Sequence, residues 1–437
     1  MSTENLEPYW MPFTSNRAFK KAPRMLTAAK GHYYTDADGR QLLDGFSGLW
    51  TCGLGHCHPK IVAAVQSQVA TLDYSMAFQM GHPQAFELAE KVVGLAPEGF
   101  TRIFFTNSGS EAADTALKIS IAYHRARGEA TRTRLIGREK GYHGVNFGGT
   151  SVGGMPLNRK VFSAVMIPGV DHIRHTHSLA DMAFSKGQPT WGAHLAEDLE
   201  RLVQLHDASN ISALIVEPAS GSSGILVPPV GYLDRLREIC DKHGILLIFD
   251  EVITAFGRVG AAFGAQRFGV TPDIITVAKG LTNGVIPMGA VLVKESVYQA
   301  LMSGPENLIE LFHGYTYSGH PVAAAAGLAT MQIYQEERSF AQVCDIEGTF
   351  ETLLHELKAE PHVIDIRNIG LMGGVELAPR TGSPGARGFE VFMRCFNDGV
   401  VIRNSGDIIQ LSPFFGSTED ELIRIIDTIR RALRALA

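Results

Sequence analysis

The middle of the chain alternates short apolar runs with longer amphipathic stretches. Four runs are almost continuous in aliphatic or aromatic residues, as strands buried on both faces tend to be: residues 102–106, 211–216, 245–249 and 274–277. Between them, residues 112–126 and 232–243 have helical spacing, and Gly244 stands where a left-handed residue would end the second helix. Strands that alternate with helices predict an α/β fold with a mostly parallel sheet.

The two ends of the chain have a different pattern. The first sixty residues hold short elements separated by glycine and proline, with a hairpin signal at residues 33–39. Near the C-terminus, residues 418–421 (TEDE) form a capping box ahead of an apolar stripe at helical spacing. That stripe consists of Leu422, Ile425, Ile426, Ile429, Leu433 and Leu436. We therefore expect a large domain at residues 63–321 and a smaller α+β domain built from residues 1–62 and 322–437.

Composition indicates a large folded enzyme. The 437 residues carry a net charge of −6 without a basic tract, which argues against nucleic acid or an anionic membrane as partner. The charged stretch at residues 125–140 is expected to be a solvated helix end and loop.

No apolar run approaches the ~18 residues of a membrane span, and the first ten residues lack the apolar core of a secretory signal. Five scattered cysteines indicate a reducing cytoplasm, and 46 glycines with few charges indicate buried interface and an oligomer.

Polar residues follow each of the four predicted strands. Residues 106–111 (TNSGSE) follow the first and open a helix, whereas Glu217, Asp250 and Lys279 follow the other three. Ligands of open parallel sheets bind beyond the carboxyl ends of the strands. We therefore expect these four polar groups to converge on one edge of the sheet.

Each of these groups has more than one interpretation. The small residues at 107–110 could bind an anion such as phosphate at the helix N-terminus, or they could be an ordinary helix cap. Lys279 could be a surface lysine or a desolvated amine that attacks a carbonyl. Asp250 could be an ion-pair partner, a metal ligand or the counter-charge of a heterocyclic cation. Together, a phosphate-binding helix N-terminus (a phosphate cradle), an aspartate and a lysine in this order are the parts that pyridoxal phosphate needs.

Residues 52–58 (CGLGHCH) gather sulfur and imidazole groups that suggest a metal site. Their spacing matches no paired zinc-binding motif, so we expect no metal. Pro59 and the two glycines indicate a turn whose histidines satisfy backbone groups. A nicotinamide dehydrogenase lacks support because no GxGxxG motif occurs, and no GxxxxGK[ST] motif occurs either.

Five motifs resemble those of one enzyme family: residues 106–112 (TNSGSEA), 141–144 (GYHG), 248–253 (IFDEVI), 278–280 (AKG) and 314–321 (GYTYSGHP). The chain resembles class III aminotransferases, which are fold-type I pyridoxal-phosphate enzymes, and among them the ω-amino acid:pyruvate (β-alanine:pyruvate) aminotransferases. The resemblance runs from residues 10–13 (WMPF) to the final helix. It implies a large domain around a mostly parallel seven-stranded sheet.

The resemblance also implies which residues bind the cofactor. Lys279 would form a Schiff base with pyridoxal 5'-phosphate, and Asp250 would keep the pyridine nitrogen protonated. The other cofactor-binding residues implied are Val252 and Tyr142 on the two ring faces, His143 beside them, Gly109 and Ser110 on the phosphate, and Thr316 on the phosphate of the neighbouring subunit. The active site would therefore lie at the interface of a homodimer or homotetramer.

On the substrate side, the resemblance places Glu217 near the Schiff base and its water. Trp50 would line the pocket with Phe78 of the partner subunit, and Arg403 followed by Gln410 would receive the substrate carboxylate. Without the resemblance, Arg403 would be an ordinary surface arginine after a strand.

One position departs from the pattern of 2-oxoglutarate-dependent relatives. These typically carry an acidic residue five positions after the equivalent of Glu217, where this chain has Ser222. The difference favours pyruvate as acceptor and an ω-amino acid or amine as donor. The expected reaction gives L-alanine and a semialdehyde or ketone by a ping-pong mechanism. Alternatives are a 2-oxoglutarate-dependent ω-aminotransferase, an aminomutase, decarboxylase or racemase on the same fold, and a non-catalytic scaffold.

Overall fold

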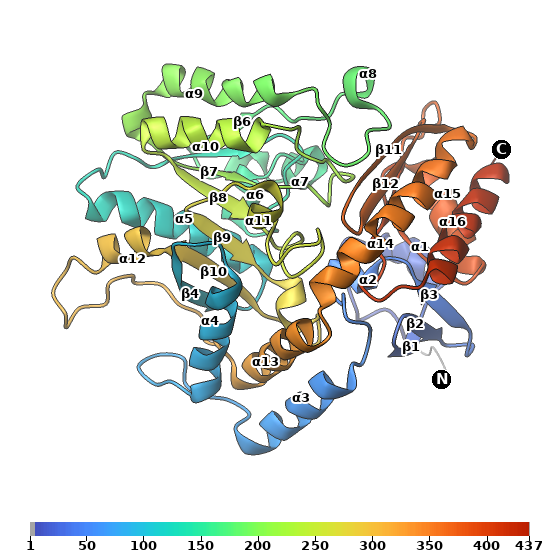
Figure 1. The fold of residues 1–437 in the computed structure, drawn as a ribbon, viewed down its shortest axis with the longest axis horizontal. Helices are drawn as coiled ribbons and strands as arrows, with labels where there is room; N and C mark the ends of the chain where they lie inside the picture. Colours follow the sequence, from blue (N-terminus) through green and yellow to red (C-terminus); the bar gives the residue numbers. More distant parts are fainter. Residues whose placement is uncertain (1–4, 437) are drawn as a thin grey trace.

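The computed structural model describes residues 5–436, and a seven-stranded sheet forms its largest part (Figure 1). The strand order is β4 (Phe100–Thr106), β10 (Gly289–Lys294), β9 (Ile274–Val277), β8 (Leu246–Asp250), β7 (Ile211–Val216), β5 (Arg134–Arg138) and β6 (Val170–Ile173). β10 runs antiparallel to both of its neighbours, and the other six strands are parallel. The predicted mostly parallel α/β sheet is confirmed.

Helices cover both faces of this sheet. α5 (Gly109–Ala126) lies against one face, where Ala116 packs in one apolar cluster with Ile248. The next residue of β8, Phe249, belongs to the cluster on the other face, with α10 (Tyr232–His243) and α13 (Pro321–Glu336). Because successive side chains of a strand alternate between the faces, both sets must be apolar. This explains the continuous apolar runs in the sequence.

Two four-stranded sheets lie beside the large one, at the right of Figure 1. The first joins β1 (Leu26–Lys30), β2 (Tyr33–Asp36) and β3 (Gln41–Asp44) with β13 (Val400–Val401), which pairs parallel to β3. The second is antiparallel and consists of β11 (Val363–Ile369), β12 (Met372–Leu377), β15 (Ile408–Leu411) and β14 (Arg403–Ser405). Strands from both ends of the chain thus pair with each other. The domain boundaries at residues 62 and 321 stay a prediction.

Two helices, α14 (Ser339–His355) and α15 (Ala386–Asn397), pack on the C-terminal sheet, and α16 (Glu419–Arg434) packs on both of them. The remaining helices are α1 (Asn16–Lys21), α2 (Ser47–Trp50), α3 (Pro59–Thr71), α4 (Pro83–Leu95), α6 (Phe147–Val152), α7 (Pro156–Lys160), α8 (Leu179–Met182), α9 (Asp198–His206), α11 (Gly264–Phe268) and α12 (Glu295–Leu301). No helix within residues 5–436 combines the length and the apolar character that crossing a bilayer requires.

Several predicted elements agree with the structure closely. The helix at residues 232–243 is confirmed and ends at Gly244, whose φ of 65° is left-handed. The capping box of α16 is formed, with the Thr418 side chain accepting from the Glu421 N–H at 3.2 Å. Five residues of its apolar stripe are buried, whereas Leu436 lies past the end of the helix. α5 begins at Gly109, three residues earlier than predicted, because Ser108 caps it.

Two predictions were wrong in detail. The stretch at residues 125–140 is not only a helix end and loop, because it contains strand β5 of the large sheet with Ile136 fully buried. In the turn at residues 52–58, the histidines bond carboxylates rather than backbone groups. His56 Nε2 lies 2.9 Å from an Asp44 oxygen, and His58 Nε2 lies 3.5 Å from one of Glu337.

Candidate active site

A cavity of about 720 Å³ opens at the carboxyl ends of the parallel strands. The predicted site residues that line it are Trp50, Gly109, Ser110, Tyr142, His143, Glu217, Asp250, Val252, Lys279 and Arg403. Ser222 lies in the same wall. The convergence expected from the strand ends is therefore present in the structure.

Lys279 occupies the floor of this cavity. It follows β9 and opens a 3₁₀ turn with a φ of 46°, a left-handed conformation that is strained for a residue with a side chain. Its ammonium nitrogen lies 5.3 Å from the ring centre of Trp50. Burial lowers the pKa of Lys279 from 10.5 to about 8, although the charges of Asp250 and Glu217 act in the opposite direction. An amine with this pKa is partly neutral near neutral pH and can act as a nucleophile.

Asp250 is the last residue of β8, and three neighbours hold its carboxylate. One oxygen accepts hydrogen bonds from the Thr276 hydroxyl at 3.1 Å and from the Val252 N–H at 3.2 Å. The other lies 2.8 Å from Nδ1 of His143, which is itself buried. The carboxylate is thereby fixed at the cavity wall, where it can stabilise a cation inside.

Glu217 follows β7 and is also buried. One of its oxygens accepts from the Tyr142 N–H at 3.0 Å and from the Ser220 hydroxyl at 2.5 Å. Burial raises the pKa of Glu217, and the charge of Asp250 raises it further, against the opposing effect of His143. A carboxyl with a raised pKa next to an amine with a lowered one is a pair suited to proton transfer.

The N-terminus of α5 accommodates both interpretations of the small-residue segment. Ser108 caps the helix by accepting from the Glu111 N–H at 3.2 Å, which leaves Gly109 and Ser110 facing the cavity. The Ser110 hydroxyl accepts from the Val145 N–H at 3.1 Å. At Gly144, whose φ is 90°, a Cβ would lie 2.4 Å from that hydroxyl oxygen, so only glycine fits. The segment is a capped helix, and its first N–H groups are available to an anion in the cavity.

Arg403 enters the cavity from the other side, at the start of β14 in the C-terminal sheet. Its guanidinium makes no hydrogen bond or ion pair with any residue that the structure describes. A planar cation without a partner at the mouth of the cavity can receive a carboxylate in two parallel hydrogen bonds.

Three predicted residues do not line this cavity. The Phe78 side chain is 51% exposed and lies close to Gly314. Thr316 is exposed, and its carbonyl accepts from the Tyr74 hydroxyl at 3.0 Å. The Gln410 amide is buried and donates to the Gly221 carbonyl at 2.9 Å. Their predicted roles in binding stay predictions.

Sequence reasoning missed several residues of the cavity wall. Phe13, Leu157 and Phe162 contribute apolar side chains to it. Phe13 belongs to the segment at residues 10–13 that carries part of the family resemblance, so its position could have been suspected. Residues 157 and 162 lie in no motif, and only the chain path around α7 brings them to the site.

The fold and the site together define a class of protein, the fold-type I pyridoxal-phosphate enzymes. A family model described as aminotransferase class-III matches residues 14–433. The chain belongs to this family of aminotransferases.

Named relatives and solved structures agree with this. An omega-aminotransferase of Caulobacter vibrioides is 58% identical over 98% of both chains. A beta-alanine–pyruvate aminotransferase of Pseudomonas aeruginosa is 52% identical over 99% of this chain and 97% of its own. An amine transaminase from an uncultivated Pseudomonas species, solved in its PLP-bound internal aldimine form, superposes with a TM-score of 0.90 at 35% identity and covers 98% of each chain. The omega transaminase of Pseudomonas jessenii in complex with PMP gives a TM-score of 0.92 at 32% identity, over 97% and 95%.

Proposed function

We propose that this enzyme transfers an amino group from an ω-amino acid such as β-alanine, or from an amine, to pyruvate. The products are L-alanine and a semialdehyde or ketone, formed in two half-reactions with ping-pong kinetics. The observation that carries the proposal is the buried amine of Lys279, placed in one cavity with the carboxylates of Asp250 and Glu217 and the unpartnered Arg403. The names of the relatives at 58% and 52% identity support the donor and the acceptor.

The residues of the cavity fit pyridoxal phosphate. The N-terminus of α5 offers N–H groups to a phosphate, and Gly109 leaves room there, since a Cβ would come within 3.0 Å of Val252. Val252, on one side of the cavity, and Tyr142 are proposed to lie on opposite faces of the ring. Asp250 would face the ring nitrogen, and His143 would orient Asp250 through its 2.8 Å contact.

Bound at this site, the cofactor supplies an aldehyde that exchanges amines and a ring that withdraws electrons from the substrate carbon. The carboxylate of Asp250 stabilises the positive charge on the ring nitrogen, which strengthens that withdrawal. With the cofactor bound, the Lys279 amine would remove the proton from the substrate carbon in one half-reaction and would return one in the other. Glu217, which accepts from the Tyr142 N–H and the Ser220 hydroxyl, would hold a water at the reacting centre. The indole of Trp50, 5.3 Å from the Lys279 amine, would keep bulk water from it.

Arg403 is proposed to bind the carboxylate of pyruvate and of the ω-amino acid. It carries no ion pair within residues 5–436, and Ser222 stands in the cavity wall at the position where 2-oxoglutarate-dependent relatives have an acid. An arginine without a neighbouring carboxylate is available to the donor's carboxylate in one half-reaction and to that of a short acceptor in the other. This supports pyruvate as acceptor.

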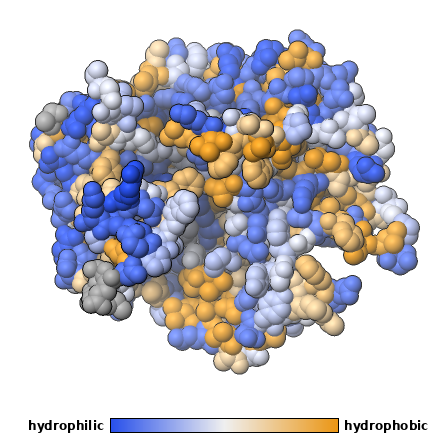
Figure 2. Space-filling model, turned by 180° about the vertical axis from the view of Figure 1, so that it is seen from behind, coloured by the Kyte–Doolittle hydropathy of each residue, from blue (hydrophilic) through white to orange (hydrophobic). Residues whose placement is uncertain are grey.

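The active unit is proposed to be a homodimer or a dimer of dimers. An apolar groove of about 780 Å³ runs along α4 and β4 and includes Met76, Met80 and Phe86, which are 51%, 64% and 71% exposed. Figure 2 shows that apolar residues also gather in patches on the rear face of the molecule. Such exposed apolar area is typical of a surface that a second copy covers. Thr316 and Phe78 would then reach the partner's site.

A cytoplasmic location is also proposed. All five cysteines are free, and two of them, Cys57 and Cys344, are exposed. Exposed thiols without disulfide partners are typical of a reducing compartment.

A donor and acceptor panel tests the proposed reaction. β-Alanine, γ-aminobutyrate, taurine, putrescine and 1-phenylethylamine are each offered with pyruvate or 2-oxoglutarate, and L-alanine or glutamate is measured. We expect L-alanine in amounts equal to the donor consumed. Faster turnover with 2-oxoglutarate, or conversion of the donor without any acceptor, contradicts the proposal.

Two variants of the enzyme, assayed with the same panel, separate the loss of proton transfer from the loss of carboxylate recognition. Lys279→Ala should abolish turnover with every donor because it removes the amine that moves the proton. Arg403→Ala should lower kcat/KM for β-alanine by about a hundredfold or more, since two charged hydrogen bonds of roughly 1.5–3 kcal/mol each are lost. For 1-phenylethylamine, which has no carboxylate, Arg403→Ala should lower kcat/KM far less. Equal losses of kcat/KM for the two donors would show that Arg403 does not bind the carboxylate.

A further inference from the structure

The loop that follows Glu217, residues 218–226, lies between the large sheet and the C-terminal sheet. It folds back on itself, with backbone hydrogen bonds in both directions between Ser220 and Leu226 at 3.0 and 2.9 Å. The N–H groups of Gly224 and Ile225 both donate to the Gly221 carbonyl. The loop carries the Ser220 hydroxyl that bonds Glu217, and its Ser222 lies in the cavity wall.

Arg367 of β11 holds one end of this loop. Its guanidinium is buried and donates to the Gly224 carbonyl from Nη2 at 2.8 Å and from Nε at 3.2 Å. Nε also donates to the Ile225 carbonyl at 3.2 Å. At Gly224, whose φ is 105°, a Cβ would lie 3.4 Å from Nη2 and 2.3 Å from Ile408. The arginine and the loop backbone are thus packed in direct contact.

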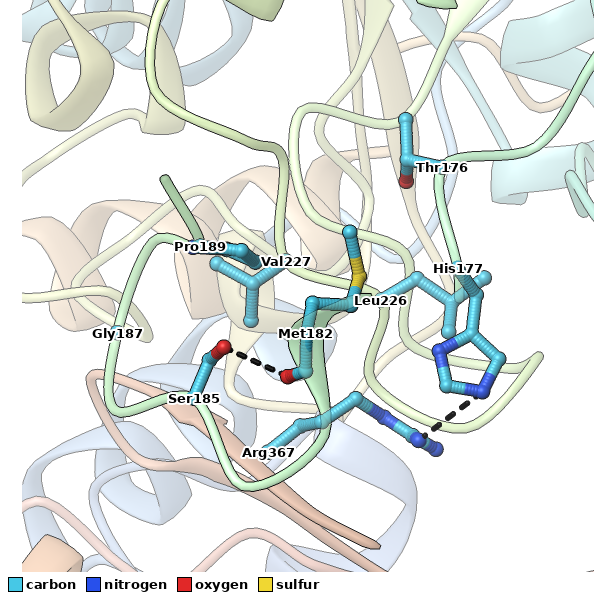
Figure 3. Close-up of a pocket in the computed structure, with 9 residues that line it drawn as sticks. All are labelled: Thr176, His177, Met182, Ser185, Gly187, Pro189, Leu226, Val227 and Arg367. Atoms are coloured by element: carbon cyan, nitrogen blue, oxygen red, sulfur yellow. Dashed lines mark hydrogen bonds between the residues drawn. The ribbon is translucent and has the colours of Figure 1, made fainter. Parts of the chain in front are cut away.

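The charge of Arg367 is balanced by two carboxylates, and a histidine lies beside them. Nη1 donates to Asp365 and, at 2.6 Å, to Glu376, and it lies 3.4 Å from Nε2 of His177 (Figure 3). Asp365, Glu376 and His177 have their ligand atoms within 4.8 Å of one another, the one such group in residues 5–436. Because the guanidinium bonds all three, Arg367 takes the place that a metal ion would need.

Two further side chains of the same sheet hold the other end of the loop. The Gln410 amide on β15 donates to the Gly221 carbonyl at 2.9 Å. The Ser405 hydroxyl on β14 donates to the Ser222 carbonyl at 3.1 Å. Arg403, at the start of β14, lies two residues before Ser405. One sheet therefore supplies both the carboxylate-binding candidate and all three side chains that hold the loop.

We propose that Arg367, with Gln410 and Ser405, is a positioning residue that sets the separation between Arg403 and Glu217. The proposal rests on the proposed function. A donor with an amino group at one end and a carboxylate at the other needs Arg403 and the reacting centre at a fixed distance. An amine without a carboxylate uses only the large-sheet side of the site and does not depend on that distance.

The test compares two variants that lack hydrogen bonds to the loop with a matched control variant. Ser405→Ala removes one hydrogen bond to the loop, and the double variant Arg367→Met with Asp365→Asn removes three hydrogen bonds without leaving Asp365 as an unpaired buried charge. Arg237→Met is the control, because Arg237 is a half-buried arginine that pairs with Asp273 and Asp241 away from the cavity. Each holoenzyme is assayed with β-alanine and with 1-phenylethylamine, and amide hydrogen exchange is measured at Ser220 and Leu226.

We expect kcat/KM for β-alanine to fall about tenfold in the double variant and less in Ser405→Ala, mainly through KM, with a change below about threefold for 1-phenylethylamine. Amide hydrogen exchange at Ser220 and Leu226 should be faster in Ser405→Ala and in the double variant, but not in Arg237→Met. Equal losses for both donors, or unchanged exchange, overturn the proposal. If the double variant does not fold, Ser405→Ala decides it by the same two measurements. If the parent enzyme does not use β-alanine, the proposed function fails, and hydrogen exchange still decides whether the three side chains hold the loop.

Discussion

At the scale of single residues, the site depends on charges held away from water. Lys279 is half-buried and Glu217 is buried, and the loss of water contact shifts their pKa values toward each other, down for the amine and up for the acid. Asp250 stays held by hydrogen bonds from Thr276 and Val252. Burying an ammonium in the cofactor-free protein destabilises the fold, so this arrangement serves the chemistry at a cost in stability.

Replacing Lys279 should therefore stabilise the cofactor-free protein. A lysine with a pKa of about 8 when folded and 10.5 when unfolded binds fewer protons in the folded state between these values. The free energy of unfolding then rises with pH from 8 to 10.5, and the full penalty applies below pH 8. We expect Lys279→Met to be more stable than the parent by about 1–3 kcal/mol at pH 7, with the difference shrinking toward pH 10.

Urea unfolding of both cofactor-free proteins at pH 7 and pH 9.5, at one protein concentration, measures this difference. Lys242→Met is the control, because Lys242 is an exposed lysine paired with Glu200 on the surface. A Lys279→Met protein that is less stable than the parent at pH 7 would contradict the burial of a charged amine.

At the scale of elements, local signals located several helix ends and strands correctly but missed one strand. The capping box at Thr418 and the left-handed Gly244 depend on neighbours along the chain, and both were predicted correctly. Strand β5 was missed because arginines stand at both of its ends. In the structure, Arg134 pairs with Asp171, and Arg138 donates to the Glu217 carbonyl at 2.9 Å. These partners are distant in sequence, so no local pattern could show that the arginines are compensated.

The cap of α16 gives a prediction at this scale. Thr418→Ala removes the hydrogen bond to the Glu421 N–H and should lower the free energy of unfolding by about 1 kcal/mol. A shift of the urea midpoint at fixed protein concentration measures the loss. Thr352→Ala, at an exposed position inside α14, removes no cap and should leave stability unchanged or slightly higher. Equal effects of the two substitutions would show that the cap contributes nothing.

At the scale of the whole molecule, the proposed dimer completes each site. Thr316 and Phe78 do not line the cavity of their own chain, and the apolar groove along α4 lies open in the single chain. If a site takes one residue from each of two copies, mixing two different inactive variants can restore an intact site.

Mixing Lys279→Ala with Thr316→Asp should therefore restore activity. In a mixed dimer one site carries both defects and the other carries none, so random exchange of subunits returns about a quarter of the parent's activity. The activity is measured after exchange, with mixed dimers counted by a mass tag on one variant. Lys279→Ala mixed with Asp250→Asn is the control, because both residues belong to the same chain's site and no intact site can form. Mixed dimers without recovered activity would place Thr316 outside the partner's site.

The chain by itself determined the alternation of buried strands and amphipathic helices, the ends of its best-capped helices, and the order of cradle, aspartate and lysine along one sheet edge. These follow from neighbours in sequence and from the rule that parallel strands share a carboxyl edge. Only the tertiary structure brought β14 and Arg403 to the same cavity, turned Gln410 from that cavity to the Gly221 carbonyl, and placed Arg367 against His177 and the Gly224 carbonyl. Those contacts join residues far apart in the chain, and their formation depends on how the two sheets pack, which no local pattern encodes.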